Sequence, residues 1–196
     1  MSLHPGPRVV RRVETGAGEP AVVLEAGMNN GAASWQRVIP LLAPHVRVAA
    51  YDRAGIGDSA PAPGLVTIDR QIDDLTSVIT GLSAGPCVLA GHSWGGVLVQ
   101  LLAFRRPDLV AGLVLVDPGH EEMHRLLPLP VQWGLRIMLT VFPDELHDDA
   151  PVTLAAEAPR GRHVVVDGAG HNIPRDRPDV VADTILAVAA AARAGR

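Results

Sequence analysis

The chain has 196 residues, of which 47% are hydrophobic and 19% charged, and its formal net charge is −4. This length suits a single domain, residues 1–196, and the composition excludes an intrinsically disordered chain. The mild charge and the lack of any basic run argue against nucleic acid as a partner. The one cysteine, Cys87, excludes an internal disulfide and is expected to be a core thiol.

The apolar segments of the sequence bear on the cellular location of the protein. Residues 1–12 contain arginines but no apolar run of the kind found in signal peptides. No stretch approaches the roughly 18 apolar residues of a membrane span. We therefore expect a cytoplasmic protein with no membrane span. All 17 basic residues are arginines, a bias of GC-rich genomes that favours a bacterial source.

Short apolar runs alternate with helical patterns along the chain. In order, we expect strands at residues 9–15, 21–25, 46–51, 87–90, 112–116 and 163–166. The helices expected between and after them are residues 34–42, 68–82, 96–105 and 179–193. This alternation predicts an α/β fold, a mostly parallel twisted sheet with helices on both faces.

The segment from Gly119 to Arg160 is ambiguous. Prolines interrupt residues 126–130, which predicts a loop or a turn. Residues 131–141 fit a helix, but residues 137–141, Ile-Met-Leu-Thr-Val, also fit a strand. The periodicity leaves both interpretations open.

The most informative motif is Gly91-His92-Ser93-Trp94-Gly95, which lies between an expected strand and an expected helix. A G-x-S-x-G sequence in this setting is a nucleophile elbow, in which small flanking residues permit a very tight turn. Ser93 is the candidate nucleophile. It needs a general base, because a serine hydroxyl is a weak nucleophile near neutral pH. We expect His92 to point away from Ser93 and to pack under the turn.

Three further segments resemble motifs of the α/β-hydrolase family and follow the family's order. Residues 52–59 are similar to the D-x-x-G-x-G-x-S loop. Residues 24–28 resemble the H-G-x oxyanion segment, although Ala26 replaces its histidine. Residues 167–173 resemble the G-x-G-H turn that carries the catalytic histidine. The resemblance extends over about residues 9–188 and implies the α/β-hydrolase fold.

The resemblance also implies a serine hydrolase with a Ser-His-Asp triad. His171 would be the general base for Ser93. The main-chain amides of Met28 and Trp94 would form the oxyanion hole. No cofactor and no metal are implied. The serine at the elbow argues against the dehalogenase and epoxide hydrolase branches of the family, which carry aspartate there.

Two carboxylates compete for the role of the acid. Asp117 ends the strand at 112–116, at the edge of the sheet where catalytic groups collect in α/β folds. Its surroundings resemble a D-P-x-H-E variant of the family. Asp144 precedes His171 at a distance close to that of members whose acid follows the seventh strand of the family's sheet. We favour Asp117, because Asp144 requires a strand at 137–141.

Members of the family usually carry several lid helices, and this chain is short by comparison. Residues 118–136 are the room that remains for a residual lid, so we expect an open site that tolerates bulky groups. Apolar surface left uncovered by a short lid favours a homodimer.

The sequence thus predicts a carboxylic ester hydrolase that acts on a small-molecule ester through an acyl-enzyme. Two alternatives stay open, because fold does not determine function. One is a small-molecule sensor on the same fold, and the other is a degenerate hydrolase with little turnover.

Two other motifs carry less weight. Residues 52–59 are rich in glycine but lack the Lys and Ser/Thr pair of a phosphate-binding P-loop. His147, Asp148 and Asp149 are neighbours in one acidic segment. We expect them to be solvated charges rather than metal ligands, since adjacent residues seldom close a coordination shell.

Overall fold

Alternating strands and helices make up the computed structural model, which describes residues 12–82, 85–118, 138–143 and 162–195. The strands are β1 (Arg12–Thr15), β2 (Val22–Glu25), β3 (Val48–Tyr51), β4 (Cys87–His92), β5 (Val110–Val116), β6 (Met138–Pro143) and β7 (Arg162–Val166). The α-helices are α1 (Ile39–Leu42), α2 (Ile68–Leu82), α3 (Trp94–Arg105), α6 (Ile173–Asp176) and α7 (Pro178–Ala194). Two 3₁₀ helices are η1 (Ala32–Trp35) and η2 (Pro107–Leu109).

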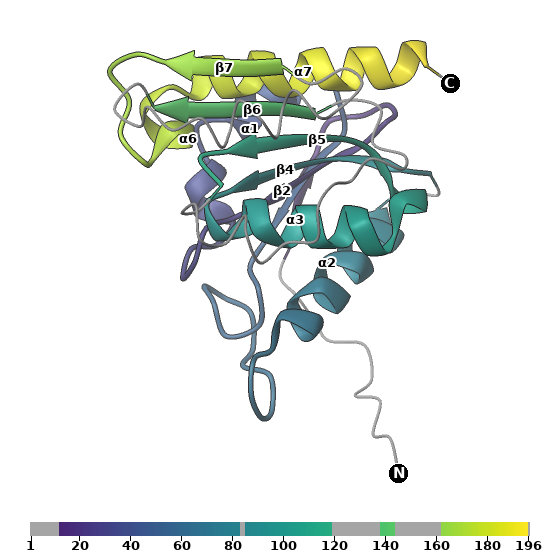
Figure 1. Ribbon diagram of the computed structural model, residues 1–196. Helices are drawn as coiled ribbons and strands as arrows, with labels where there is room; N and C mark the ends of the chain where they lie inside the picture. The colour runs from purple at the N-terminus through teal and green to yellow at the C-terminus, as the bar shows by residue number, and fades with distance from the viewer. Residues whose placement is uncertain (1–11, 83–84, 119–137, 144–161, 196) are drawn as a thin grey trace.

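The strands form one twisted sheet in the order β1-β3-β2-β4-β5-β6-β7 (Figure 1). β1 runs antiparallel to β3, and each of the other neighbouring pairs is parallel. The mostly parallel sheet predicted from the sequence is confirmed. Its parallel strands end at one edge, and the loops that leave this edge carry the candidate site residues.

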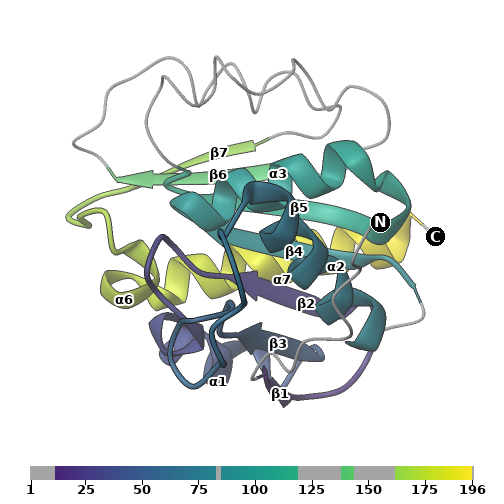
Figure 2. The ribbon, with the colours of Figure 1, turned by 90° about the horizontal axis from the view of Figure 1, so that it is seen from below.

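Helices cover both faces of this sheet (Figures 1 and 2). On one face α2 and α3 pack against strand residues that include Val23, Leu89 and Leu113. On the other face α1 and α7 pack against strand residues that include Leu24 and Val88. The central strands are therefore buried on both sides. This explains why they are continuous apolar runs rather than alternating ones.

The helix predicted over residues 68–82 is confirmed as α2. Its side chains at Ile72, Leu75, Ile79 and Leu82 are buried against the sheet, as their spacing predicts. The ambiguous residues around 137–141 form β6, which pairs with β5 in parallel. The strand interpretation is therefore confirmed for residues 138–141, and the helix interpretation is wrong for the same residues.

The helix predicted over residues 34–42 is wrong as a single element. The segment forms η1, then a turn, and then the single turn of α1. Pro40 has no amide hydrogen to donate to a preceding turn, so it is accepted only in the first turn of a new helix. The apolar side chains of the segment are nevertheless buried, namely those of Trp35, Val38 and Leu42.

Nearly all of the proposed lid segment, residues 118–136, lies outside the described residues. Of this range only Pro118 is described, and it is buried. No helix of the described part of the chain combines the length and hydropathy of a membrane span.

Candidate active site

Ser93 occupies the sharp turn between β4 and α3. Its backbone has φ 51° and ψ −120°, a conformation that residues other than glycine rarely adopt. The turn requires glycine on both sides, since a Cβ on Gly91 would lie 2.4 Å from the carbonyl oxygen of Gly95. A Cβ on Gly95 would lie 2.4 Å from the carbonyl oxygen of Glu25. The Ser93 amide donates to the carbonyl of Val116 over 3.0 Å, which ties the turn to the end of β5.

His171 lies between Ser93 and Asp117. Its Nε2 is 3.1 Å from the Ser93 hydroxyl oxygen, and its Nδ1 is 2.5 Å from Asp117 Oδ2. A proton on Nδ1 donates to the carboxylate, which leaves Nε2 as an acceptor for the serine hydroxyl. The Asp117 side chain is 7% exposed and the His171 side chain 58% exposed. The carboxylate is thus shielded, while the imidazole faces solvent.

Asp144, the competing acid, lies outside the described residues. β6 ends at Pro143, directly before it. The carboxylate beside His171 in the described part of the chain is that of Asp117, which follows β5 in a left-handed conformation with φ 41°.

His92 supports the loop that carries His171. It is 2% exposed, and its Nε2 donates to the main-chain carbonyl of His171 over 2.7 Å. The two imidazole rings lie 4.9 Å apart between centroids. Burial lowers the pKa of His92. A neutral ring with its proton on Nε2 fits this donor role.

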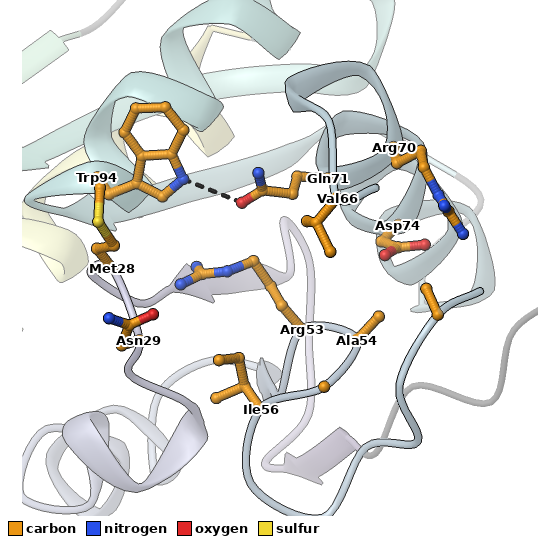
Figure 3. A pocket seen from close by; sticks show the side chains of 12 residues that line it. Met28, Asn29, Arg53, Ala54, Ile56, Val66, Arg70, Gln71, Asp74 and Trp94 are labelled. Atoms are coloured by element: carbon orange, nitrogen blue, oxygen red, sulfur yellow. Dashed lines mark hydrogen bonds between the residues drawn. The ribbon is translucent and has the colours of Figure 1, made fainter. Parts of the chain in front are cut away.

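The two expected oxyanion donors flank Ser93. Met28 lies in the loop after β2, and Trp94 is the first residue of α3. Within the described residues neither main-chain amide has a backbone acceptor. Trp94 lies at a helix N-terminus, where unpaired amides and the helix dipole favour negative charge. The Trp94 indole donates to the Gln71 side chain over 3.0 Å (Figure 3).

A buried charge network that the sequence reasoning missed lies under the loop of Met28. Arg53 pairs with Glu25, which also accepts a hydrogen bond from the Tyr51 hydroxyl. Burial raises the pKa of Glu25, although the Arg53 charge opposes this. The available signal was a glutamate inside an apolar strand run, since charged residues are almost never buried without a partner.

The loop over residues 52–59 has a structural role in the described part of the chain. The two carboxylate oxygens of Asp52 accept the amides of Ala32 (2.8 Å) and Asp58 (3.2 Å). The Ser59 hydroxyl donates to the Asp52 carbonyl over 2.7 Å. These contacts close the loop on itself and hold it against the start of η1.

A cavity of about 400 Å³ opens beside the elbow (Figure 3). Met28 and Trp94 form one end of it. Apolar side chains from the loops after β3, such as Ile56 and Val66, line it together with Arg53. The cavity therefore begins where the two candidate oxyanion donors lie.

Metal ligands are a separate question. No group of three or more His, Cys, Asp or Glu side chains in the described ranges is arranged to hold a metal ion. His147, Asp148 and Asp149 lie outside those ranges.

Comparison with known proteins identifies the family. The sequence profile of the alpha/beta hydrolase fold matches residues 20–154. The chain is 33% identical over 97 residues to RutD of Pantoea ananatis, provisionally named a carbamate hydrolase, covering 49% of this chain and 35% of RutD. It is 39% identical over 105 residues to the lipase LipV of Mycobacterium tuberculosis, covering 53% of this chain and 40% of LipV.

A solved structure agrees with the observed architecture. An esterase from Thermogutta terrifontis superposes with a TM-score of 0.79 at 20% identity, over 93% of each chain. Identity this low shows a shared fold and no more. The chain belongs to the alpha/beta hydrolase fold family. Its sequence matches span less than half the length of the curated relatives named above, and both relatives are named as hydrolases.

Proposed function

We propose that the protein is a serine hydrolase that cleaves carboxylic esters through an acyl-enzyme. The observation that carries this proposal is the hydrogen-bonded series of Ser93, His171 and Asp117 at the carboxyl edge of the sheet. A serine, an imidazole and a buried carboxylate in this order make up the machinery of acyl transfer.

Acylation begins at Ser93. Its Oγ attacks the substrate carbonyl while His171 Nε2 takes the hydroxyl proton. Asp117 accepts the hydrogen bond from His171 Nδ1–H and stabilises the imidazolium. The amides of Met28 and Trp94 donate to the developing oxyanion. The tetrahedral intermediate then collapses, the bond to the alcohol breaks, and the leaving oxygen receives the proton from His171.

Deacylation repeats these steps with water. His171 takes a proton as the water oxygen attacks the acyl-enzyme carbonyl. Collapse of the second tetrahedral intermediate releases the carboxylic acid, and the proton returns to Ser93. The cycle needs no cofactor, and the residues that carry protons are those already named.

The relatives support hydrolysis of a carbonyl substrate. LipV is named a lipase and RutD provisionally a carbamate hydrolase. An ester and a carbamate both present a carbonyl carbon with a leaving group. An ester is our first choice, and a p-nitrophenyl carbamate belongs in the same assay.

The decisive experiment compares wild-type protein with Ser93→Ala on p-nitrophenyl esters from acetate to octanoate. We expect kcat/KM to fall by about 10³-fold or more, because the variant lacks the nucleophile. The open cavity beside the elbow predicts activity across this range of chain lengths. A well-folded wild type with no Ser93-dependent turnover would rule out the proposal and favour a small-molecule sensor or a degenerate hydrolase.

The acid is tested by a matched pair of variants. We expect Asp117→Asn to lower kcat by about 10³- to 10⁴-fold, since an amide favours the wrong tautomer of His171. Asp144→Asn is the control, and it should stay within about twofold of wild type in kcat. Steady-state kinetics on one ester measures both. The reverse pattern would assign the acid to Asp144.

A further inference from the structure

The loop Ala26–Asn30 presents the proposed Met28 donor on an exposed turn. Met28 is 60% exposed, and Asn29 has a left-handed backbone with φ 58°. Within the loop, the Asn30 amide donates to Gly27 over 3.2 Å. An oxyanion donor must stay within a few tenths of an ångström of its working position. Something outside the turn has to hold it.

Arg53 makes this connection from beneath the loop. Its Nη1 donates to the Ala26 carbonyl over 2.7 Å and pairs with the Glu25 carboxylate. Its Nη2 donates to the Gly27 carbonyl over 2.5 Å and to the Asn30 carbonyl over 3.4 Å. One guanidinium thus contacts the chain on both sides of Met28.

The bond to Gly27 acts on the proposed donor itself. The Gly27 carbonyl and the Met28 N–H belong to one planar trans peptide, in which they point in opposite directions. Holding the oxygen therefore sets the direction of the N–H. A cation on the oxygen also polarises the peptide, which makes its N–H a stronger donor.

Burying the Arg53–Glu25 ion pair costs desolvation free energy, which argues for a role beyond stability. The side chains of Arg53 and Glu25 are 6% and 1% exposed. A buried ion pair is weak evidence of stabilisation, because desolvation of the two charges offsets their attraction. The family's H-G-x segment has a histidine at the position of Ala26, and this chain has none there. In this chain the guanidinium from the loop after β3 contacts the segment.

We propose that Arg53 is a positioning residue for the oxyanion hole, and that Glu25 in turn orients Arg53. This inference rests on the proposed function, because the Met28 amide acts as an oxyanion donor only if an oxyanion forms beside Ser93. Arg53 acts through the Gly27–Met28 peptide and does not touch the reacting atoms.

The test is Arg53→Lys, which keeps the positive charge but loses the planar fork that serves several acceptors at once. We expect kcat to fall by about 10- to 100-fold while KM stays within about threefold, because the oxyanion contact strengthens in the transition state. Titration of active sites with a fluorophosphonate normalises kcat to the folded fraction of each protein.

A second measurement distinguishes loss of positioning of the oxyanion donor from a general loosening of the structure. A trifluoromethyl ketone forms a tetrahedral adduct with the serine and places an oxyanion in the hole. Its inhibition constant should rise by the same factor by which kcat/KM falls. Wild-type kcat and inhibitor affinity in Arg53→Lys, or a change in KM alone, would overturn the proposal.

Arg47→Lys is the matched control. Arg47 lies just before β3, as Arg53 lies just after it, and it also pairs with a glutamate, Glu14. It likewise donates to a main-chain carbonyl, that of Leu82 over 2.8 Å. Because this pair lies at the opposite end of the strand, the variant should keep kcat within about twofold.

If Arg53→Lys does not fold, Glu25→Gln carries the test. It removes the charge that orients Arg53, and it should lower kcat with KM retained. An unchanged kcat, or loss of the fold in both variants, would overturn the positioning role and leave a purely structural pair. Wild-type protein without Ser93-dependent turnover would instead remove the proposed function itself.

Discussion

At the scale of single residues, unfavourable backbone conformations gather at the candidate site. Among the described residues, the non-glycine residues with positive φ are Asn29, Ser93 and Asp117. They follow β2, β4 and β5, whose ends lie side by side. Such conformations cost about 1–3 kcal/mol each and persist only where surrounding contacts hold them. The bond from the Ser93 amide to Val116 is one such contact.

His92 shows how the position before the proposed nucleophile is used. Of the histidines that the structure describes, His171 is the one within hydrogen-bond distance of the Ser93 hydroxyl, and His92 is buried. Its bond to the His171 carbonyl ties the loop after β7 to the end of β4. The two histidines therefore make different contacts, His92 with the His171 carbonyl and His171 with the Ser93 hydroxyl.

The protonation of His92 makes a prediction for stability. Burial lowers its pKa in the folded protein, so below about pH 6.5 the unfolded chain binds more protons than the folded one. The stability that depends on neutral His92 is present above that pH and is lost as the pH falls. Wild type should therefore lose more unfolding free energy than His92→Gln between about pH 7.5 and 5.

Urea denaturation at both pH values measures this difference. His171 and Asp117 are the other titratable groups that influence the pKa of His92, and both wild type and His92→Gln keep them. Parallel changes in the two proteins would contradict the assignment of this pH dependence to His92.

At the scale of elements, the close approach of β4 and α3 determines the elbow. Gly91 lies near the end of the buried strand, and a Cβ added to it would meet the backbone of Gly95 and Gly96 in the first turn of the helix. The helix starts too close to its own strand to leave room for a side chain at Gly91, and the end of β2 leaves none at Gly95. The apolar composition of α3 follows from the same packing, since residues from Val97 to Ala103 include most of its buried positions.

The crowding predicts the effect of a single methyl group. Gly91→Ala should lower the free energy of unfolding by about 1–3 kcal/mol, because the new Cβ would meet backbone rather than a movable side chain. It should also lower the kcat of the proposed ester hydrolysis by displacing Ser93.

Gly85→Ala is the control for this variant, since a Cβ there meets nothing within 4 Å. Its stability should be unchanged or raised by up to about 1 kcal/mol, because alanine restricts the unfolded chain. Thermal or urea unfolding measures both variants. Equal stability of the two would show that the elbow can relax around the methyl group.

At the scale of the whole molecule, the parallel sheet brings distant segments to one edge. Ser93 and His171 are 78 residues apart in the chain, and Asp117 and His171 are 54 apart. Each follows a strand of the same sheet, so their loops meet beyond its carboxyl edge, where ligands bind in α/β folds. The cavity beside the elbow lies at this edge. Tolerance of bulky groups and a homodimer both stay predictions.

The sequence by itself determined the features that depend on near neighbours. The bounds of α2 follow from apolar spacing along one helix face, and the elbow follows from glycines within a few residues of Ser93. The continuous apolar runs likewise indicated strands buried on both sides. These signals are local, since side-chain periodicity and short-range steric limits act within one element.

Only the tertiary structure decided the features that depend on distant partners. β6 forms because β5 and β7 pair with it on both sides. Asp117 lies beside His171 because β5 and β7 end at the same edge, and Arg53 meets Glu25 because β3 pairs with β2. No local pattern contains these outcomes, because each depends on which strands the folded sheet makes neighbours.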